Sequence, residues 1–262
     1  MNGIAPKPLW SVGFLAGLSL LCVGGYFGLA RMPWLSAQKV TVSGALRLSP
    51  EEIRRRAGLR TGQNILAMNL ALAEKRLRSE PWVAEARVER TFPPGFRVRV
   101  REHEPLARFD VGTGYLVDAQ GRVFKRRGAD DPLEIPVVSG LRISDLPRPD
   151  EASHAFQAVM NVLQIGRRPD AVLPIEMIER IGVDPELGIT LTVAPDDRLA
   201  GAREIRLGFD DFPAKFDRLR TFSRFVLEDG HMRLQSIDLN IPDRVVVEPD
   251  PAGASVGDEK EV

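Results

Sequence analysis

The feature that most constrains this chain is a long stretch near its start, from Trp10 to Ala30, that contains no charged residue. A helix rises about 1.5 Å per residue, so this stretch matches the hydrocarbon thickness of a bilayer. One alternative is a cleaved signal peptide, since Leu35–Ala37 loosely resembles a cleavage site, but such a peptide has an apolar region of only about 7 to 15 residues. The other is a lipoprotein signal ending at Cys22, but Ser19–Leu21 lacks the expected small residues. We therefore expect an uncleaved membrane helix at residues 10–30.

The charges that flank this helix do not decide its orientation. Lys7 precedes it while Arg31 and Lys39 follow it, so the preference of basic residues for the cytoplasmic side is nearly balanced. Length decides instead, because the tail at residues 1–9 is too short to be the working domain and long downstream domains are translocated regardless of charge. We expect the N-terminus in the cytoplasm and the rest of the chain outside the cytoplasmic membrane.

Glycines gather along one side of the expected membrane helix. At 100° per residue four of them share an arc of about 60°, and they are spaced as in closely packed membrane helices; they are Gly13, Gly17, Gly24 and Gly28. Glycine is also simply common in membrane helices. The pattern predicts a face that packs against another transmembrane helix, with that ordinary abundance as the alternative.

Composition limits which folds and partners are possible for the rest of the chain. Of 262 residues, roughly 220 follow the membrane segment, enough for two small domains with their own cores. Lys and Arg number 36, as do Asp and Glu, so no net charge favours nucleic acid. The single cysteine, Cys22, lies in the apolar stretch, which excludes a disulfide-stapled fold.

A short linker at residues 31–37 leads to a first domain, expected at residues 38–104. Residues 38–44 alternate polar and apolar and end at glycine, which predicts a strand. Ser49, Pro50 and Glu52 form the pattern of a capping box and predict the start of a helix.

A second helix and two strands complete this domain. Leu70, Ala73 and Leu77 recur at helical spacing within residues 69–78. Residues 83–91 and 96–101 predict strands, the second with apolar and arginine residues in strict alternation. The order strand, helix, helix, strand, strand predicts a small sheet with helices on one face.

Residues 105–249 are expected to form a second domain of short strands with two helices. The helices are expected at residues 150–165 and 213–227, and the tail at residues 250–262 is too polar to fold. The strands are expected at residues 106–109, 115–117, 123–124, 135–138, 178–183, 189–193, 204–208, 236–240 and 245–247. The fold class expected for the chain is therefore α+β.

In this order, the motifs resemble those of the FtsQ/DivIB family of bacterial cell-division proteins. They are Val42–Gly44, Ser49–Ile53, Gly62–Leu66, Pro81–Val83, Arg90–Pro93, Arg101–Ala107, Val117–Phe124 and Ile237–Leu239. The resemblance implies a POTRA domain, then the family's β-domain. It also implies a single-pass protein of the inner membrane at the division septum, with its C-terminal domain in the periplasm and no enzymatic activity.

The resemblance also implies partners. It implies that the protein binds FtsB and FtsL, and it extends the partners to FtsK, FtsW, FtsI and FtsN. The expected contact is a strand at Val245–Val247 with no later strand to cover its edge, because an open edge offers N–H and C=O groups that a partner strand can pair with. An ordinary closing strand is the alternative, and Val246→Pro is the substitution expected to remove an edge donor.

The resemblance assigns further residues to these contacts. The FtsB surface is expected to consist of Arg218, Phe222, Ile241, Asp243, Arg244, Val245, Val246 and Val247. Asn240 stands where the family favours arginine. A surface for upstream division proteins matches Glu85, Val88 and Arg90, although strand parity places Glu85 opposite the other two.

The residues give no sign of catalysis or of a bound cofactor. His103, His154 and His231 are far apart in sequence and lack metal-ligand spacing. No nucleophile elbow or phosphate loop occurs. We therefore expect no catalytic, cofactor or metal site, and no nucleic acid or small-molecule ligand. The alternatives are a POTRA-bearing assembly or secretion adaptor and a membrane-anchored envelope hydrolase.

Overall fold

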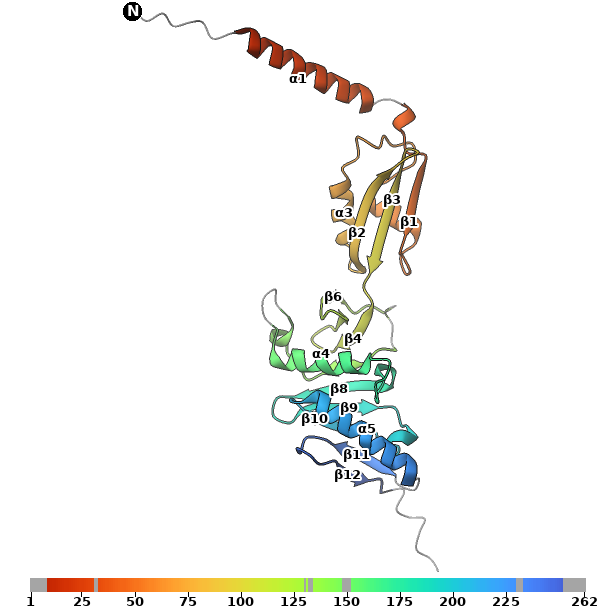
Figure 1. Cartoon of the computed structure of the whole chain (residues 1–262), viewed down its shortest axis with the longest axis vertical. Coiled ribbons are helices and arrows are strands. Elements are labelled where there is room, and N and C mark those ends of the chain that lie inside the picture. The colour runs from red at the N-terminus through yellow and green to blue at the C-terminus, as the bar shows by residue number, and fades with distance from the viewer. Residues whose placement is uncertain are drawn as a thin grey trace, which may run out of the picture. The chain divides into compact units, whose positions relative to one another are not determined.

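The computed structural model describes residues 9–30, 33–129, 131, 134–147, 152–229 and 233–251, without the side chains of residues 9–12, 26, 27, 29, 30, 33, 228 and 229. The chain divides into two compact units, with the boundary after His103. In the first unit, helix α1 spans Leu9–Ala30 (Figure 1). Counting only the described residues, no helix combines the length and apolarity needed to cross a membrane.

The first unit contains a three-stranded sheet with the predicted order of elements. These are β1 Lys39–Ser43, α2 Pro50–Ala57, α3 Leu70–Arg78, β2 Val83–Thr91 and β3 Gly95–Glu102, after a short 3-10 helix, η1, at Pro33–Leu35. Strand β3 is central, parallel to β1 and antiparallel to β2. The predicted strand, helix, helix, strand, strand order is confirmed.

Local side-chain chemistry explains where the two helices begin. The Ser49 hydroxyl accepts the N–H of Glu52 at 3.2 Å, and Asn69 caps α3 by accepting the N–H of Leu72 at 3.1 Å. The Glu52 carboxylate accepts a hydrogen bond from Arg56 at 2.7 Å, so among the described contacts only the serine half of the predicted capping box forms. Each cap satisfies one N–H that the first helical turn leaves unpaired.

The alternation along β3 creates the core of this unit. Phe96, Val98 and Val100 are buried, while the arginines between them are exposed. Ile53 of α2 and Leu77 of α3 are fully buried in the same cluster. Burial of each large apolar side chain contributes about 1.5–3 kcal/mol, so the helices are held to one face of the sheet chiefly by this contact.

The carboxylate of Glu102, at the end of β3, orders the loop between β1 and α2. It accepts the backbone N–H groups of Leu46, Arg47 and Leu48 at 3.2, 2.9 and 3.1 Å. Glu102 is 9% exposed, so water cannot readily replace it. The Arg47 guanidinium lies 4.3 Å from the centre of the Trp82 ring, which fixes the same loop from its outer side.

We predict that Glu102→Ala destabilises the first unit, because three backbone N–H groups lose their carboxylate acceptor. The expected loss is about 1–3 kcal/mol, measured from hydrogen exchange of the amides in β1 and β3. Glu104→Ala is the matched control, since the Glu104 side chain is 83% exposed and its nearest ion pair, with Arg167, is 4.0 Å long. Equal exchange in both variants would contradict the role given to Glu102.

The second unit is built on one mixed sheet of nine strands. Their order is β12-β11-β10-β9-β8-β7-β4-β5-β6. The strands are β4 Pro105–Phe109, β5 Tyr115–Asp118, β6 Val123–Arg126, β7 Val137–Ser139, β8 Ile178–Asp184, β9 Gly188–Val193, β10 Glu204–Gly208, β11 Leu234–Asp238 and β12 Val246–Pro249. The helices are α4 His154–Gly166 and α5 Phe212–Asp229, with short 3-10 helices η2 Ile143–Asp145, η3 Ile175–Met177 and η4 Asp197–Leu199.

Every predicted strand end of this unit lies within two residues of the observed one, and the differences at two strands have identifiable reasons. Strand β7 begins at Val137, after Pro136, whose nitrogen has no hydrogen to donate. Strand β11 begins at Leu234 and ends at Asp238 rather than at Asn240, because the Asp238 carboxylate accepts the N–H of Asn240 at 2.7 Å and turns the chain. The α+β class is confirmed.

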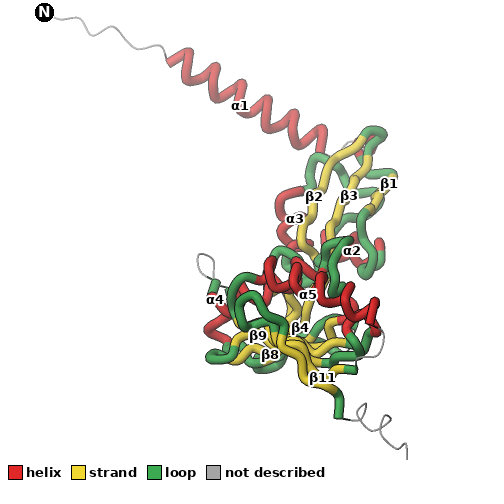
Figure 2. Tube along the Cα trace, turned by 60° about the horizontal axis from the view of Figure 1, so that its bottom comes forward, coloured by secondary structure: helices red, strands yellow, loops and turns green. Residues whose placement is uncertain are grey.

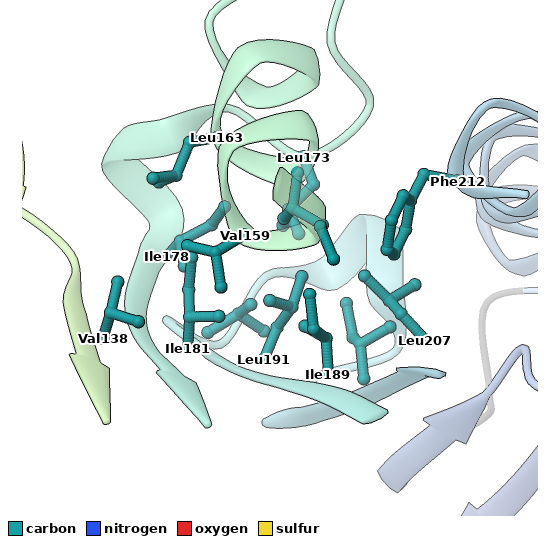
Figure 3. Packing of buried hydrophobic residues seen from close by; sticks show 14 of the residues in the cluster. Val138, Val159, Leu163, Leu173, Ile178, Ile181, Ile189, Leu191, Leu207 and Phe212 are labelled. Carbon is teal, nitrogen blue, oxygen red and sulfur yellow. The ribbon is translucent and has the colours of Figure 1, made fainter. Parts of the chain in front are cut away.

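Helices α4 and α5 cover one face of this sheet, as Figure 2 shows. Val159 of α4 lies over Ile181 of β8, and Phe212 of α5 lies beside Leu207 of β10 in the same core (Figure 3). The opposite face of the strands nearest β12 carries charged and polar side chains. These strands therefore present an apolar face to the helices and a polar face to solvent.

Candidate partner-binding edge

Strand β12 forms one edge of the nine-stranded sheet. Among the described strands it pairs with β11 alone, antiparallel, with Ile237 opposite Val247 and Asp238 opposite Val246 (Figure 1). An edge strand leaves every second residue with an N–H and a C=O directed away from the sheet. Which residues those are follows from the hydrogen bonds of β11.

Successive residues of β11 direct their backbone N–H and C=O groups alternately to its two neighbouring strands, β10 and β12. The N–H of Leu239 donates to the carbonyl of Arg206 at 2.9 Å, so this residue and every second residue before it face β10. Ser236 and Asp238 lie between these positions, and their backbone groups therefore face β12.

The register between β11 and β12 shows which backbone groups of β12 point toward β11. Val246 and Glu248 lie opposite Asp238 and Ser236, so their backbone groups point inward to β11. Val247 therefore directs its N–H and C=O to the open side, while Pro249 has no N–H to offer. The prediction that Val246→Pro removes an edge donor is wrong, because that N–H faces β11. The outward donor in β12 is Val247.

The side chains at the edge divide between the two faces. Val245 and Val247 pack, partly buried, against the core under α5, as does Phe222 of that helix. Val246 projects from the other face and is 41% exposed. Ile241, in the turn before β12, is 47% exposed. Val245 and Val247 thus lie on the same face of the sheet as Phe222 of α5, whereas Val246 lies on the opposite face.

Arg218 of α5 links the helix to the end of β11. Its Nη2 donates to the carbonyl of Leu239 at 2.8 Å, and its Nε is buried without a partner among the described residues. A guanidinium bound to a backbone carbonyl contributes more than a neutral hydrogen bond. Arg218 therefore acts here as a positioning residue for the segment that leads into β12.

A tight turn joins β11 to β12. Asp243 adopts a left-handed backbone with φ of 58°, and the N–H of Arg244 donates to the carbonyl of Ile241 at 3.4 Å. Left-handed geometry is uncommon outside glycine but is accessible to aspartate. Asp243 and Arg244 are exposed, so the residues predicted on this turn do lie at the surface next to the edge.

Two residues that sequence reasoning did not single out pack beneath this turn. Gly208 has φ of +63°, and a Cβ there would stand 2.3 Å from Oδ1 of Asn240, so only glycine leaves room for that amide. Lys215 of α5 is buried and donates from Nζ to the carbonyl of Leu207 at 2.6 Å. Desolvation lowers the pKa of Lys215, an effect that Asp210, Asp211 and Asp238 oppose and Arg218 strengthens.

The polar face next to β12 carries a linked set of charges. Arg206 donates from Nε to Glu204 at 2.8 Å and approaches Glu248 of β12 at 3.5 Å. The Ser236 hydroxyl donates to Glu248 at 2.6 Å. This hydroxyl and then Arg206 lower the pKa of Glu248. The set ties β12 to β11 and β10 from the face opposite α5.

The other predicted surface does not come together on one face. Val88 is 4% exposed and belongs to the core of the first unit, and Arg90 donates to the carbonyls of Ile65 and Met68 at 2.6 and 2.9 Å. Glu85 is exposed and pairs with Arg101 at 2.5 Å. Glu85 and Arg90 are exposed and Val88 is buried, and strand parity places Glu85 on the side opposite the other two.

The glycines of α1 have open surroundings. A Cβ added at any of the four positions would meet nothing within 4 Å in the described structure; these are Gly13, Gly17, Gly24 and Gly28. The packing face that they suggest stays a prediction.

The described histidines and acidic residues do not meet the requirements of a metal site. Within the described residues, no group of three His, Cys, Asp or Glu side chains could hold a metal ion. The His154 ring lies 5.5 Å from that of Phe209, and the N–H of His103 donates to the carbonyl of Trp82. His231 lies outside the described residues.

The described chain is thus a β-α-α-β-β unit of the POTRA type followed by a mixed nine-stranded sheet with β12 at one edge. Residues 35–103 match the model of the POTRA domain, FtsQ-type, and residues 106–240 match that of the cell division protein FtsQ/DivIB, C-terminal. The chain belongs to the FtsQ/DivIB family of cell-division proteins.

Individual relatives agree with this assignment. "Cell division protein FtsQ" of Syntrophotalea carbinolica is 30% identical over 249 residues, covering 92% of this chain and 85% of the relative. Its namesake from Anaeromyxobacter sp. is 33% identical over 215 residues, covering 78% and 70%. That from Salinibacter ruber is 30% identical over 260 residues, covering 90% and 93%.

We predict that Arg218→Ala loosens β12 without unfolding the sheet, because the Leu239 carbonyl loses a charged donor. The expected cost is about 1.5–3 kcal/mol, read from faster hydrogen exchange in β11 and β12. Arg224→Ala is the control, since Arg224 is exposed on the same helix. If both variants exchange alike, Arg218 does not position the edge.

Proposed function

We propose that this protein is a scaffold of the bacterial division complex that holds FtsB, and with it FtsL, at the open edge of β12. The observation that carries this proposal is the outward N–H and C=O of Val247 on a strand that pairs with β11 alone among the described strands. The family assignment supports the division role. The proposed limits are residues 38–104 for the POTRA domain and 105–249 for the β-domain.

The proposed site is a backbone edge flanked by apolar side chains. An added strand of FtsB would pair with the Val247 groups, and its side chains would meet Val245 and Phe222 near α5 and Ile241 at the turn. Asp243 and Arg244 would supply polar contacts beside it. Strand addition draws affinity from main-chain hydrogen bonds and specificity from such side chains.

We further propose that residues 10–30 anchor the protein in the inner membrane. The N-terminus lies in the cytoplasm, and the POTRA domain and the β-domain lie in the periplasm, at the division septum. The absence of charged residues from residues 10–30 and the helix at Leu9–Ala30 support this placement. The glycine side of this helix and the surface around Glu85 are the proposed contacts for FtsK, FtsW, FtsI and FtsN.

We predict that Val247→Pro in the full-length protein abolishes co-purification of FtsB and FtsL from membranes. Proline removes the outward donor but none of the hydrogen bonds to β11, and proline is tolerated at such positions. Val247→Thr keeps the N–H and is the matched control for the side chain. Retention of FtsB by the proline variant, with hydrogen exchange in β11 unchanged, would exclude edge pairing through Val247.

The division role has its own test in the native cell. Depletion of the protein is expected to give filaments, because septal wall synthesis loses its scaffold, and a fluorescent fusion is expected at mid-cell. Wild type and Val247→Thr are expected to restore normal cell length, while Val247→Pro is not. Normal division after depletion would refute the proposed role whatever the variants bind.

A further inference from the structure

We propose that one end of the POTRA sheet docks on the surface of an anionic phospholipid bilayer. This end, here called the leading end, consists of residues 33–39, 59–65 and 91–97, where the chain passes from α1 into β1. The inference rests on the proposed membrane anchor and adds a second, peripheral contact with the same membrane.

Backbone hydrogen bonds hold the three segments of the leading end together. The N–H of Gln38 donates to the carbonyl of Pro94 at 2.7 Å, which ties the turn between β2 and β3 to the start of β1. Ala37 donates to the carbonyl of Gln63 and accepts from Gly62, both at 2.8 Å. Figure 1 shows the β2–β3 turn beside the start of β1.

The leading end is basic and carries no carboxylate side chain. Its charged residues are Lys39, Arg60 and Arg97, all of them exposed. Acidic and basic residues are equal in number in the whole chain, so this local imbalance is not a consequence of composition. Each basic residue close to an anionic membrane surface adds a favourable contribution that falls off within a Debye length.

Two carboxylates lie close to this end: Glu51 of α2 lines a pocket with Arg60, and Glu89 of β2 is already paired. Glu89 of β2 is opposite Arg97 in the register, and its carboxylate bonds Arg99 at 2.5 Å. That hydrogen bond is the main cause that lowers the pKa of Glu89, with Arg87 and Arg97 as smaller causes. The pairing leaves Arg97 without an ion pair among the described residues.

Two aromatic side chains are exposed at the same end. Phe92, in the β2–β3 turn, is 91% exposed, and Trp34, just before β1, is 66% exposed. An exposed phenylalanine gains nothing from water, whereas aromatic rings are enriched where a protein meets the interface of a bilayer. Exposed aromatic residues combined with basic residues are typical of segments that lie in this interface.

The chain keeps the leading end within reach of the proposed anchor. Seven residues separate Ala30 from Gln38, so an extended connection of eight Cα–Cα steps spans at most about 29 Å. Lipid is then always present at a high effective concentration, and weak contacts suffice for docking. A soluble protein partner lacks this advantage, so the basic charge and short reach favour lipid.

The test uses full-length protein in nanodiscs with an environment-sensitive fluorophore at position 92, attached to Phe92→Cys in a Cys22→Ser background. Spin-labelled lipid is expected to quench this probe several-fold more than the same probe at Leu46→Cys. Leu46 is the matched control because it is apolar and 88% exposed. It also lies at the other end of the sheet, where its N–H donates to Glu102 at the end of β3.

The anchor and the docking are tested separately. A probe on the native Cys22 reports the anchor, and its quenching without quenching at position 92 would overturn docking alone. Absence of quenching at both positions would overturn the anchor and docking together. Quenching at position 92 is expected to fall when phosphatidylglycerol is replaced by phosphatidylcholine, and likewise in Lys39→Gln with Arg60→Gln. Equal quenching in both lipids would overturn the claim that the surface must be anionic. Quenching at position 92 that requires an added protein would overturn lipid as the ligand.

Discussion

Burial of one side of α5 against the sheet fixes where β12, the last strand among the described residues, can lie. Strands β10 and β11 are parallel neighbours, and parallel neighbours need a crossover connection, which α5 supplies. Phe216 and Leu219 are buried on its inner side, and Arg218 between them reaches the end of β11. The turn then returns the chain as β12, so the edge depends on this one helix.

The outward N–H groups of strands β2 and β12 differ in whether another side chain accepts them. In the first unit the N–H of Val88 faces away from the sheet, and the Glu74 carboxylate of α3 accepts it at 2.9 Å. In the second unit the outward N–H of Val247 has no such acceptor among the described residues. Proteins usually protect an edge by charge, proline or a covering element. Here protection is partial, since β12 is short and ends in Pro249, and this confines pairing to the groups around Val247.

Local patterns predicted most of the fold. The alternation along residues 96–101 predicted β3 and its buried face, and the cap at Ser49 predicted the start of α2, because each depends on neighbouring residues. The helical spacing of Leu70, Ala73 and Leu77 predicted α3. The end of β11 was missed because a side chain, Asp238, competes with the ladder for the next N–H. The order of elements was predictable because each depends on short-range periodicity.

The candidate site was less accessible to sequence reasoning, because its geometry depends on residues far apart in the chain. Which N–H of β12 faces outward follows from a bond between Leu239 and Arg206, and no pattern within residues 245–247 contains that information. Lys215 and Gly208 looked ordinary in sequence, yet they pack beneath the turn through Leu207 and Asn240. The amide of Asn240 faces Gly208, at a position where the resemblance alone suggested arginine. A longer side chain at this position would have to point away from Gly208 and would change the surface beside the edge.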